Sequence, residues 1–539
     1  EAPPADLKLE YQTLLSPDAI QFLAELVVAF DKDVDQVCVI WVRKKKKKRK
    51  EAISVSPDQS SLGTLCYTDP EYCVTPLCHG VPRLMSSFEM QTGETISCKM
   101  LRKARYHHLP LSAAQWLQVD FDDGNCPTLS NQIKGIFNVY KAVRNQFPVG
   151  APPISKAPIL MLRPRAWNMV EHAMMVNGKE VPGPLFDFGL LMYHTGRILF
   201  ENESGPFFYL SKVESYLEAR LWSQIFVWTE TKLGLPLGSI KATVLIENIL
   251  ATFEMEEILY ELKAHSAGLN CGIWDYCASF VNNFGHRPEF ILPDRSKYVN
   301  MEKLFLKSYM ELLVQTCHRR GALATGGMAA LLLPKDKGTA DYQRVLATVT
   351  RLKLYEINAG VDGFMVYDFD LVEPMQKLFQ EHTKGPNQLH ILRADVVVTL
   401  QDLLSVPAGG VTLYGLKYNI GVGILFIEAW LRGQGHYHFR GQVEDSATAE
   451  ISRSQVWQWI RHRVRLEDDG RMINRSLVQS QIKELEHELQ ECFKCSTERE
   501  KERLCTATKM FLEIVQKRDF PPFITTYLNL DHTFLASSN

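Results

Sequence analysis

The sequence lacks both an excess of charge of either sign and any long apolar run. Its 60 Lys and Arg residues against 62 Asp and Glu residues give a formal net charge of −2. A chain this close to neutral is a poor candidate for a dedicated nucleic-acid binder, whose affinity rests on many phosphate-neutralising cations. The longest apolar candidates, such as residues 421–431, fall short of the roughly 20 residues that span a bilayer, and Glu428 interrupts that one. We therefore expect no nucleic-acid partner and no membrane partner.

Cysteine is too sparse for a disulfide scaffold, with 12 residues in a chain of 539. The simplest interpretation is free thiols in a reducing compartment. Cys492 and Cys495 have the spacing of half a zinc site, but they fall inside a helical pattern and have no second pair at the proper spacing. The sequence therefore predicts neither a disulfide framework nor a structural zinc ion.

The composition is that of an ordinary globular protein, with 46% hydrophobic and 23% charged residues, which excludes a disordered chain. The length suggests three or four domains, or one large barrel with additions. Residues 19–30 have helical apolar spacing, and the basic run Arg43 to Lys50 follows. We interpret that run as a solvated helical arm rather than a polyanion-binding patch. Residues 54–93 are rich in Ser, Pro, Cys and Thr and are expected to form an irregular connection.

From about residue 158 the pattern alternates between strands and helices. The expected strands are residues 158–163, 207–210, 242–247, 269–275, 322–329 and 363–367. Repeated βα units imply a parallel sheet, and this many in about 220 residues favours an α/β fold with a closed (β/α)₈ TIM barrel. An open doubly wound sheet is the alternative. From about residue 411 the strand signal fades, and a mainly helical C-terminal domain is expected.

Two carboxylates, Glu247 and Asp275, end strand-like runs. In a barrel of this kind, side chains at the carboxyl ends of the strands line the mouth of the active site. Two strand-terminal carboxylates are the oxygen ligands that Mg²⁺ prefers. Helix N-caps or surface ion pairs are the alternative interpretation. Gly272, just before Asp275, would let backbone N–H groups approach a small carboxylate closely.

Arginine and aspartate supply two further candidates. Arg163 and Arg165 flank a proline at the end of the first clear strand, where an arginine can stabilise developing oxyanion charge or form a salt bridge. Asp445 stands just before a helical pattern, and from composition alone it is a good N-cap.

Taken together, these segments resemble the malate synthase family, in its shorter isoform class from bacteria, plants and some animals. The resemblance is dense over residues 158–332 and 418–462. Its motifs lie in one order along the chain, at residues 162–167, 182–189, 205–210, 218–222, 240–247, 268–276, 292–295, 326–330 and 444–453.

The resemblance implies a barrel with an N-terminal helical clasp within residues 1–105, an inserted α/β segment within residues 106–410, and a C-terminal helical plug over residues 411–539. It implies a glyoxylate-cycle acyltransferase that condenses acetyl-CoA with glyoxylate and water to give malate and CoA, with Mg²⁺ as cofactor. These small molecules would be its partners, with a homo-oligomer left open.

The resemblance also implies residue roles. Asp445 would be the base that takes a proton from the acetyl methyl group, and Arg163 would stabilise the enolate. Glu247 and Asp275 would hold Mg²⁺. Arg163, Asp275 and the backbone from Gly272 through Trp274 would bind glyoxylate.

The chain departs from the family at Ala166, at residues 367–370 (Tyr-Asp-Phe-Asp) and at residues 436–438 (His-Tyr-His). The last two segments resemble those beside the acyl-CoA channel, so CoA affinity is the property that these departures put in question. The alternatives are a catalytically weakened homologue that acts as a scaffold or CoA-binding protein, and a related Mg²⁺-dependent acyl-CoA lyase. The family implies a peroxisomal or glyoxysomal location, with mitochondria as an alternative, and the chain shows no targeting signal: its last residues, Ser-Ser-Asn, are not the Ser-Lys-Leu address.

Overall fold

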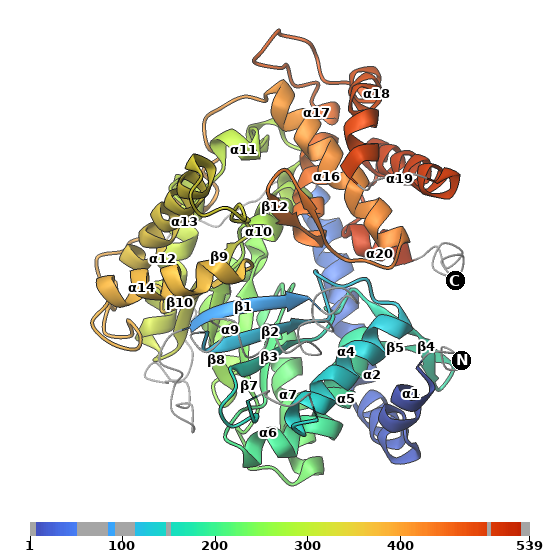
Figure 1. Ribbon diagram of the computed structural model, residues 1–539, viewed down its shortest axis with the longest axis vertical. Helices are drawn as coiled ribbons and strands as arrows, with labels where there is room; N and C mark the ends of the chain where they lie inside the picture. Colours follow the sequence, from blue (N-terminus) through green and yellow to red (C-terminus); the bar gives the residue numbers. More distant parts are fainter. Residues whose placement is uncertain (1–6, 51–84, 92–113, 147–151, 493–496, 530–539) are drawn as a thin grey trace. The chain divides into compact units, whose positions relative to one another are not determined.

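The computed structural model describes residues 7–50, 85–91, 114–146, 152–492 and 497–529 (Figure 1). For residues 38–50 and 85–91 it describes the backbone and not the side chains. The chain divides into two compact units. The first, the barrel unit, comprises the described parts of residues 1–43, 63–272 and 310–397. The second, the helical unit, comprises the described parts of residues 44–62, 273–309 and 398–539.

The barrel unit is built on eight parallel strands that close on themselves. In spatial order they are β1 (Met85–Gln91), β2 (Trp116–Asp120), β3 (Ile159–Arg163), β6 (Phe207–Leu210), β7 (Lys241–Ile246), β8 (Ser266–Cys271), β9 (Leu323–Ala329) and β10 (Gly363–Val366). The closed barrel confirms the fold that the sequence favoured and excludes the alternative of an open doubly wound sheet. Closure depends on β1, which pairs with both β2 and β10. That strand lies within residues that we expected to form an irregular connection, and this expectation was wrong for residues 85–91.

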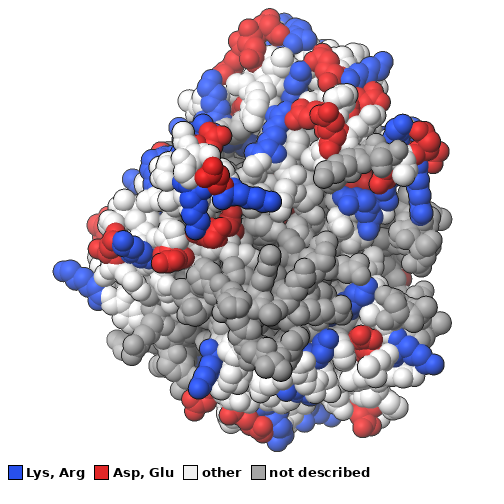
Figure 2. Space-filling model, in the orientation of Figure 1, with Lys and Arg blue, Asp and Glu red and all other residues white. Residues whose placement is uncertain are grey.

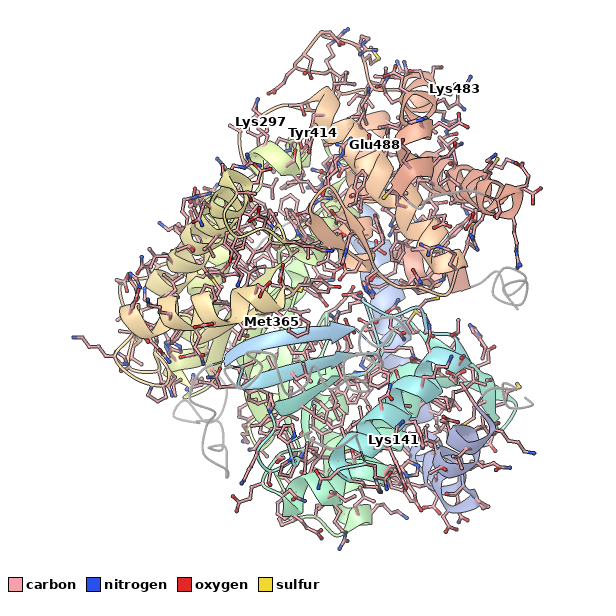
Figure 3. All side chains as sticks on the ribbon, viewed as in Figure 1. Lys141, Lys297, Met365, Tyr414, Lys483 and Glu488 are labelled. Atoms are coloured by element: carbon pink, nitrogen blue, oxygen red, sulfur yellow. The ribbon has the colours of Figure 1, made fainter. Side chains whose placement is uncertain are left out.

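Large apolar side chains from successive strands fill the inside of the barrel. The cluster comprises Trp116, Met161, Phe207, Tyr209, Leu245, Leu323 and Met365, the last labelled in Figure 3. Trp116 packs edge-on against Phe207 with ring centroids 4.6 Å apart. The barrel is therefore a packed core and not a pore, which leaves its two ends as the places for chemistry.

Amphipathic helices connect the strands on the outside. They are α4 (Leu129–Val143), α7 (Tyr216–Leu233), α9 (Met255–Glu261), α12 (Leu304–Arg319), α13 (Ala340–Ala359) and α14 (Val372–His382). Between β3 and β6 the chain adds a hairpin of β4 (Val170–Val176) and β5 (Lys179–Pro182), followed by α5 (Gly183–Leu191), a π-helical turn and α6 (Arg197–Glu201). This insertion corresponds to the α/β segment that the resemblance implied.

Two helices precede the barrel: α1 (Lys8–Leu14) packs on α4, and α2 (Pro17–Lys50) packs on the inserted segment and on α7. Leu23 and Leu26 of α2 lie against Gly189, where a β-carbon would be 2.5 Å from Leu23. Phe22 contacts the ring of Trp228 at 5.5 Å. The helix predicted at residues 19–30 is thus present and longer than expected. The side chains of the basic run, Arg43 to Lys50, lie outside those described, so the solvated-arm interpretation stays a prediction.

The helical unit contains α10 (Ile273–Phe284), α11 (Arg295–Tyr298), α16 (Leu413–Leu431), α17 (Ser446–Arg461), α18 (Arg475–Cys492), α19 (Glu498–Gln516) and α20 (Ile524–Asn529), with a hairpin of β11 (Tyr437–Phe439) and β12 (Gln442–Glu444). The C-terminal helices confirm the predicted helical domain. Its last long helical stretch consists of two helices, α18 and α19. The boundaries predicted at residues 105 and 410 stay predictions.

Positive and negative side chains are interspersed over the face shown in Figure 2, in keeping with the net charge of −2. Among the described residues, no single helix is long and apolar enough to cross a membrane, although α1 together with the first part of α2, a pair bent by 57°, would suffice by length and composition. The described cysteines are all free. Cys495 lies outside the described residues, so the prediction of no zinc there is untested.

The pairing of β8 with β9 requires a glycine at position 268. Gly268 has φ +142° and lies opposite Leu323, whose carbonyl oxygen would be 2.0 Å from an added β-carbon. Gly268→Ala should therefore lower the free energy of unfolding by more than about 2 kcal/mol, since strain and a backbone clash add. Chemical denaturation measures this. Gly178→Ala is the control, with φ +79° and no neighbour within 4 Å; a loss there of ~1 kcal/mol is expected from strain alone. Equal losses of unfolding free energy in the two variants would contradict a backbone clash at position 268.

A buried histidine should make stability depend on pH. His318 faces the Ile391 carbonyl oxygen with Nδ1 (2.7 Å) and Asp362 with Nε2 (2.9 Å), so both nitrogens donate. Burial lowers the pKa of His318, but Asp362 raises it more, to a net value above the ordinary one. The stabilisation is then complete below the unfolded pKa of about 6.5 and is lost as pH rises through the higher folded pKa.

The difference in unfolding free energy between wild type and His318→Gln should therefore be largest at acidic pH and shrink at alkaline pH. Denaturation across pH 5–9 measures it, with the exposed His487→Gln as control. A difference between the two proteins that grows with pH would contradict a raised pKa of His318 in the folded state.

Candidate active site

Three aspartates lie in the loop that leaves β2 at the carboxyl end of the barrel. Asp120 ends the strand and accepts hydrogen bonds from the backbone N–H groups of Asp122 (2.7 Å) and Gly124 (3.1 Å). This turn brings Asp122 and Asp123 back over the end of the strand. Asp120 and Asp123 are buried. Burying carboxylates requires positive partners nearby.

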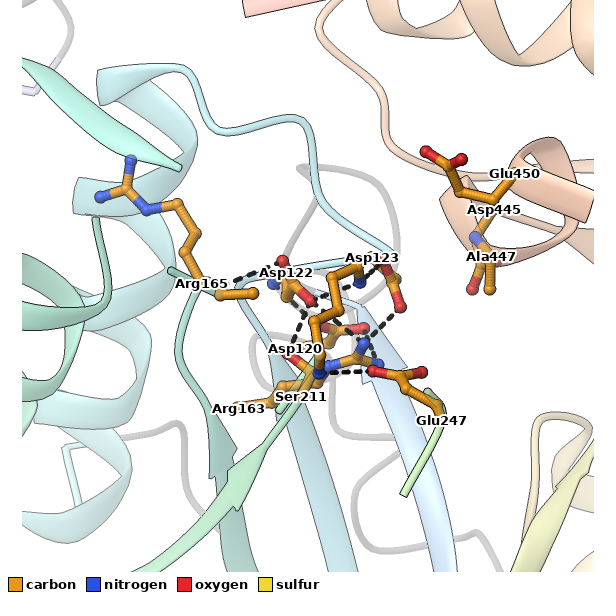
Figure 4. Close-up of polar contacts among 12 residues, drawn as sticks. Asp120, Asp122, Asp123, Arg163, Arg165, Ser211, Glu247, Asp445, Ala447 and Glu450 are labelled. Carbon is orange, nitrogen blue, oxygen red and sulfur yellow. Dashed lines mark hydrogen bonds and ion pairs between the residues drawn. The ribbon is translucent and has the colours of Figure 1, made fainter. Parts of the chain in front are cut away.

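Arg163 supplies the first positive partner (Figure 4). It ends β3 directly beside Asp120 in the sheet register. Its guanidinium contacts Asp120 at 3.4 Å and Asp122 at 3.2 Å, and it forms a close ion pair with Asp123. Burial lowers the pKa of Arg163, but the charges of these aspartates and of Glu247 raise it well above its ordinary value. Arg163 is thus a permanent buried cation at the barrel mouth, as the sequence predicted for its position.

Lys212 supplies the second cation, and the sequence analysis missed it. It stands two residues after β6, with φ +54°, and its Nζ contacts Asp122 (3.0 Å) and Asp123 (2.5 Å). Its backbone N–H donates to Glu247 Oε1 at 2.7 Å. A lysine normally indicates a solvated surface. The signal that could have found it is its place directly after a barrel strand.

Glu247 follows β7 immediately and is buried. It and Asp123 each offer a carboxylate oxygen, and these atoms lie within 4.8 Å of one another. A β-carbon on Gly272 would lie 3.5 Å from Glu247 Oε2, so the backbone after β8 passes close to this carboxylate. We call Asp120, Asp122, Asp123, Glu247, Arg163 and Lys212 the mouth cluster.

Among its six residues the mouth cluster has four carboxylates and two cations. Asp123 and Glu247 offer oxygens close enough together to share one ion. Carboxylate oxygens are the donors that Mg²⁺ and Ca²⁺ prefer. The group can therefore hold a divalent metal ion, as predicted for Glu247, with Asp123 as a ligand that sequence reasoning did not name.

Arg165, the other arginine of the motif, has a structural role. Its Nε and Nη2 donate to the two oxygens of Asp187 at 2.9 and 2.8 Å, and Nη2 also donates to Glu171 at 2.9 Å. All three residues are buried. The bidentate pair holds the inserted segment against the end of β3, which is the salt-bridge alternative that the sequence left open.

We had expected Asp275 to end a strand, and this expectation was wrong. β8 ends at Cys271, and Asp275 lies in the first turn of α10, which begins at Ile273. The apolar residues around Gly272 continue the strand pattern, but the chain turns helical after that glycine. Trp274 precedes Asp275 in the same turn, and the guanidinium of Arg295 lies over its ring at 4.9 Å. First-turn N–H groups of a helix favour an anion.

Asp445 is the N-cap of α17, with extended backbone. Its Oδ1 accepts a hydrogen bond from the Ala447 N–H at 3.0 Å, and its own N–H donates to the Thr448 hydroxyl at 3.1 Å. The side chain is 8% exposed. The capping role inferred from composition is therefore real. It fixes the carboxylate in one orientation, which is also what a positioned base needs.

The departures from the family pattern form ordered structure. Ala166 donates its N–H to Asp122 at 3.3 Å. Asp368, in the segment 367–370, accepts from the Leu333 N–H at 2.7 Å and caps a 3₁₀ turn. In the segment 436–438, His438 is exposed on β11. These contacts account for the local folds.

Comparison with known proteins gives matches along most of the chain. The family models described as malate synthase, TIM barrel domain, and malate synthase, C-terminal, match residues 159–406 and 410–531. A malate synthase of Myxococcus xanthus is 40% identical over 481 residues, which cover 88% of this chain and 86% of the relative. The glyoxysomal malate synthase of Brassica napus is 35% identical over 537 residues, with 96% and 91% covered.

A solved malate synthase of Haloferax volcanii, described as a pyruvate/acetyl-CoA ternary complex, is more distant. It is 16% identical, with a TM-score of 0.45, and the match covers 79% of this chain and 99% of that one. The family models and the relatives above 30% identity show the family without this structure. This chain belongs to the malate synthase family.

Proposed function

We propose that this chain catalyses the Mg²⁺-dependent condensation of acetyl-CoA with glyoxylate and water to give malate and CoA. The observation that carries the proposal is the close approach of the Asp123 and Glu247 carboxylates beside Arg163 and Lys212, at the carboxyl end of a barrel of the malate synthase family. A buried oxygen-donor site of this kind suits a hard divalent cation and an anionic oxygen ligand between that cation and a nearby arginine.

Asp123, Glu247 and Asp275 would hold the metal ion. The first two offer oxygens at suitable separation, and Asp275 follows the end of β8 by four residues, which keeps it within reach of that strand end. When bound, Mg²⁺ supplies positive charge that polarises the glyoxylate carbonyl group. A solved relative from Haloferax volcanii is described as a magnesium/glyoxylate complex, which supports this choice of metal for the family.

The residues at the start of α10 would receive the carboxylate of glyoxylate. Gly272 allows close approach, and the N–H groups of the first turn have no partner within the helix. Arg163 would stabilise the oxygen on which negative charge develops. Because it is already buried and charged, it needs little reorganisation when that charge appears.

Asp445 would take the proton from the acetyl methyl group. A thioester α-proton is weakly acidic, so removal requires an oriented carboxylate and stabilisation of the enolate oxygen at the same moment. The enolate carbon then forms the new bond to the aldehyde carbon of glyoxylate. Water hydrolyses the thioester of that product, which releases CoA and leaves malate.

We also propose a peroxisomal or glyoxysomal location. It is supported by relatives from Brassica napus, Glycine max and Candida tropicalis that are named as glyoxysomal malate synthases.

Metal binding should depend on Glu247. Mg²⁺ should raise the melting temperature of the wild type, because a ligand that binds only the folded state stabilises it. Glu247→Gln should lose that shift and release free thiol from acetyl-CoA and glyoxylate at least ~10²-fold more slowly, since the polarising charge is lost. Glu373→Gln, at an exposed carboxylate in α14, should behave as the wild type. A wild type that releases no thiol with Mg²⁺ would reject the proposed function and favour the scaffold alternative.

Asp445→Asn should separate the base from the N-cap. Asn still caps a helix, so the fold should persist, while turnover should fall on the order of 10²–10⁴-fold, the usual contribution of a positioned base. Glyoxylate binding, measured by calorimetry with Mg²⁺ present, should survive. Thr497→Ala, which removes the N-cap of α19, should cost stability and leave turnover unchanged. Near-normal turnover in Asp445→Asn would leave that residue with its capping role only.

A further inference from the structure

A buried arginine in the helical unit has no ion-pair partner among the described residues. Arg295 begins α11 and is 4% exposed. Its guanidinium carbon lies 4.9 Å from the ring centroid of Trp274 and 5.2 Å from that of Tyr418. Its Nε donates to Asn419 Oδ1 at 2.9 Å, and its Nη2 donates to the Ser452 hydroxyl at 3.0 Å. Two aromatic rings and two neutral acceptors thus surround the cation.

This environment is unusual for a buried charge. In the part of the chain that the structure describes, no carboxylate lies within ion-pair distance of Arg295, whereas the equally buried Arg453 in the same unit is paired with Glu450. Buried arginines are normally paired because desolvation is costly. Cation–π contacts offset part of that cost. A lysine could not replace the planar guanidinium, which contacts the rings and donates to two side chains at once.

The hydroxyl of Tyr418 extends this contact toward Asp445. It hydrogen-bonds Glu444 Oε1, which also accepts from Gln442 Nε2 at 2.8 Å. Burial and the charge of Glu444 raise the pKa of Tyr418, and the charge of Arg295 opposes them; the net pKa lies well above the ordinary value, so the hydroxyl remains a donor. Glu444 is 1% exposed, and its Oε2 has no hydrogen-bond partner among the described residues.

The two ends of this contact chain adjoin residues of the proposed mechanism. Trp274 precedes Asp275 in the first turn of α10, and Glu444 precedes Asp445 at the end of β12. Every contact between them lies within the helical unit. Burying the Glu444 carboxylate with one oxygen unpartnered costs stability. Its contacts with Tyr418 and Gln442 therefore indicate that it positions the chain rather than stabilises the fold.

We propose that Arg295, Tyr418 and Glu444 are positioning residues that hold the turn carrying Asp275 and the N-cap carboxylate of Asp445 in one fixed arrangement. The inference rests on the proposed function. Arg295 ties α11 to α16 through Asn419 and to α17 through Ser452, while its faces fix Trp274 and Tyr418. Tyr418 then fixes Glu444, whose backbone leads directly into the base. Displacement of a reacting group by about 1 Å can cost on the order of 10²-fold in rate, so such supports matter.

Variants at Tyr418 and Arg295 should have different effects at the two ends of the contact chain. Tyr418→Phe removes only the hydroxyl and keeps the ring under Arg295. It should lower kcat about 10-fold or more, because the base loosens, and change the KM for glyoxylate less than about twofold. Arg295→Met should lower kcat and also raise the KM for glyoxylate, because Trp274 loses its contact. Arg295→Lys should restore little of either, since it lacks the planar fork.

The double variant Arg295→Met with Tyr418→Phe provides the decisive measurement. If both residues act through one chain of contacts, its loss of kcat should be smaller than the product of the two single losses. The control is Thr508→Val in α19, which removes a different hydroxyl of the helical unit, one that donates to the Leu504 carbonyl oxygen at 2.9 Å. That variant should lose stability comparably and keep kcat within about twofold of the wild type.

Three outcomes would overturn the inference: normal kcat in Tyr418→Phe, multiplicative losses in the double variant, or an equal loss of kcat in Thr508→Val, which would indicate general loosening of the unit. Failure of the proposed function is distinguishable from these, because the wild type would then release no thiol or Asp445→Asn would turn over normally.

Discussion

The mouth of this barrel depends on one electrostatic constraint: four carboxylates are held together by Arg163 and Lys212. The loop after β2, the end of β3, the turn after β6 and the end of β7 each contribute to this group. None of these segments could retain its conformation with its charge buried alone. The carboxylate oxygens of this group are also donors of the kind that divalent cations prefer, so the contacts that order the loops bring together groups that can hold one.

Much of the barrel could be predicted because alternation of strands and helices is a local pattern. Residues 207–210 were placed exactly, and β3, β9 and β10 to within one residue at either end. β1 and β2 were both missed. The sequence of β1, with two serines and a glutamate, has no strand signal of its own. Its place is decided by pairing with β2 and β10, which lie far away in the sequence. Closure of a barrel is a long-range property, and a local pattern does not contain it.

The site was predicted in part for a related reason. Arg163 and Glu247 stand at strand ends, and the structure brings them into one group. Asp275 was assigned to a strand because the apolar run continues past Gly272, where the backbone in fact turns helical. Lys212 and Asp123 were missed because charged residues in loops normally face solvent, and their burial follows from each other's presence. Mutual burial of opposite charges cannot be seen in either residue alone.

The path of the chain between the two units has a consequence for fragments of this protein. α10 and α11 come from the middle of the sequence, yet they belong with α16 and α17, more than 100 residues further along. Gly285, just after α10, accepts a hydrogen bond from His462 at 2.7 Å and lies against Trp457 of α17. A fragment that starts at residue 398 would lack this covering and expose the apolar face of α17 to water. The helical unit is therefore formed by two distant segments of the chain. Expression of the C-terminal part alone would not reproduce it.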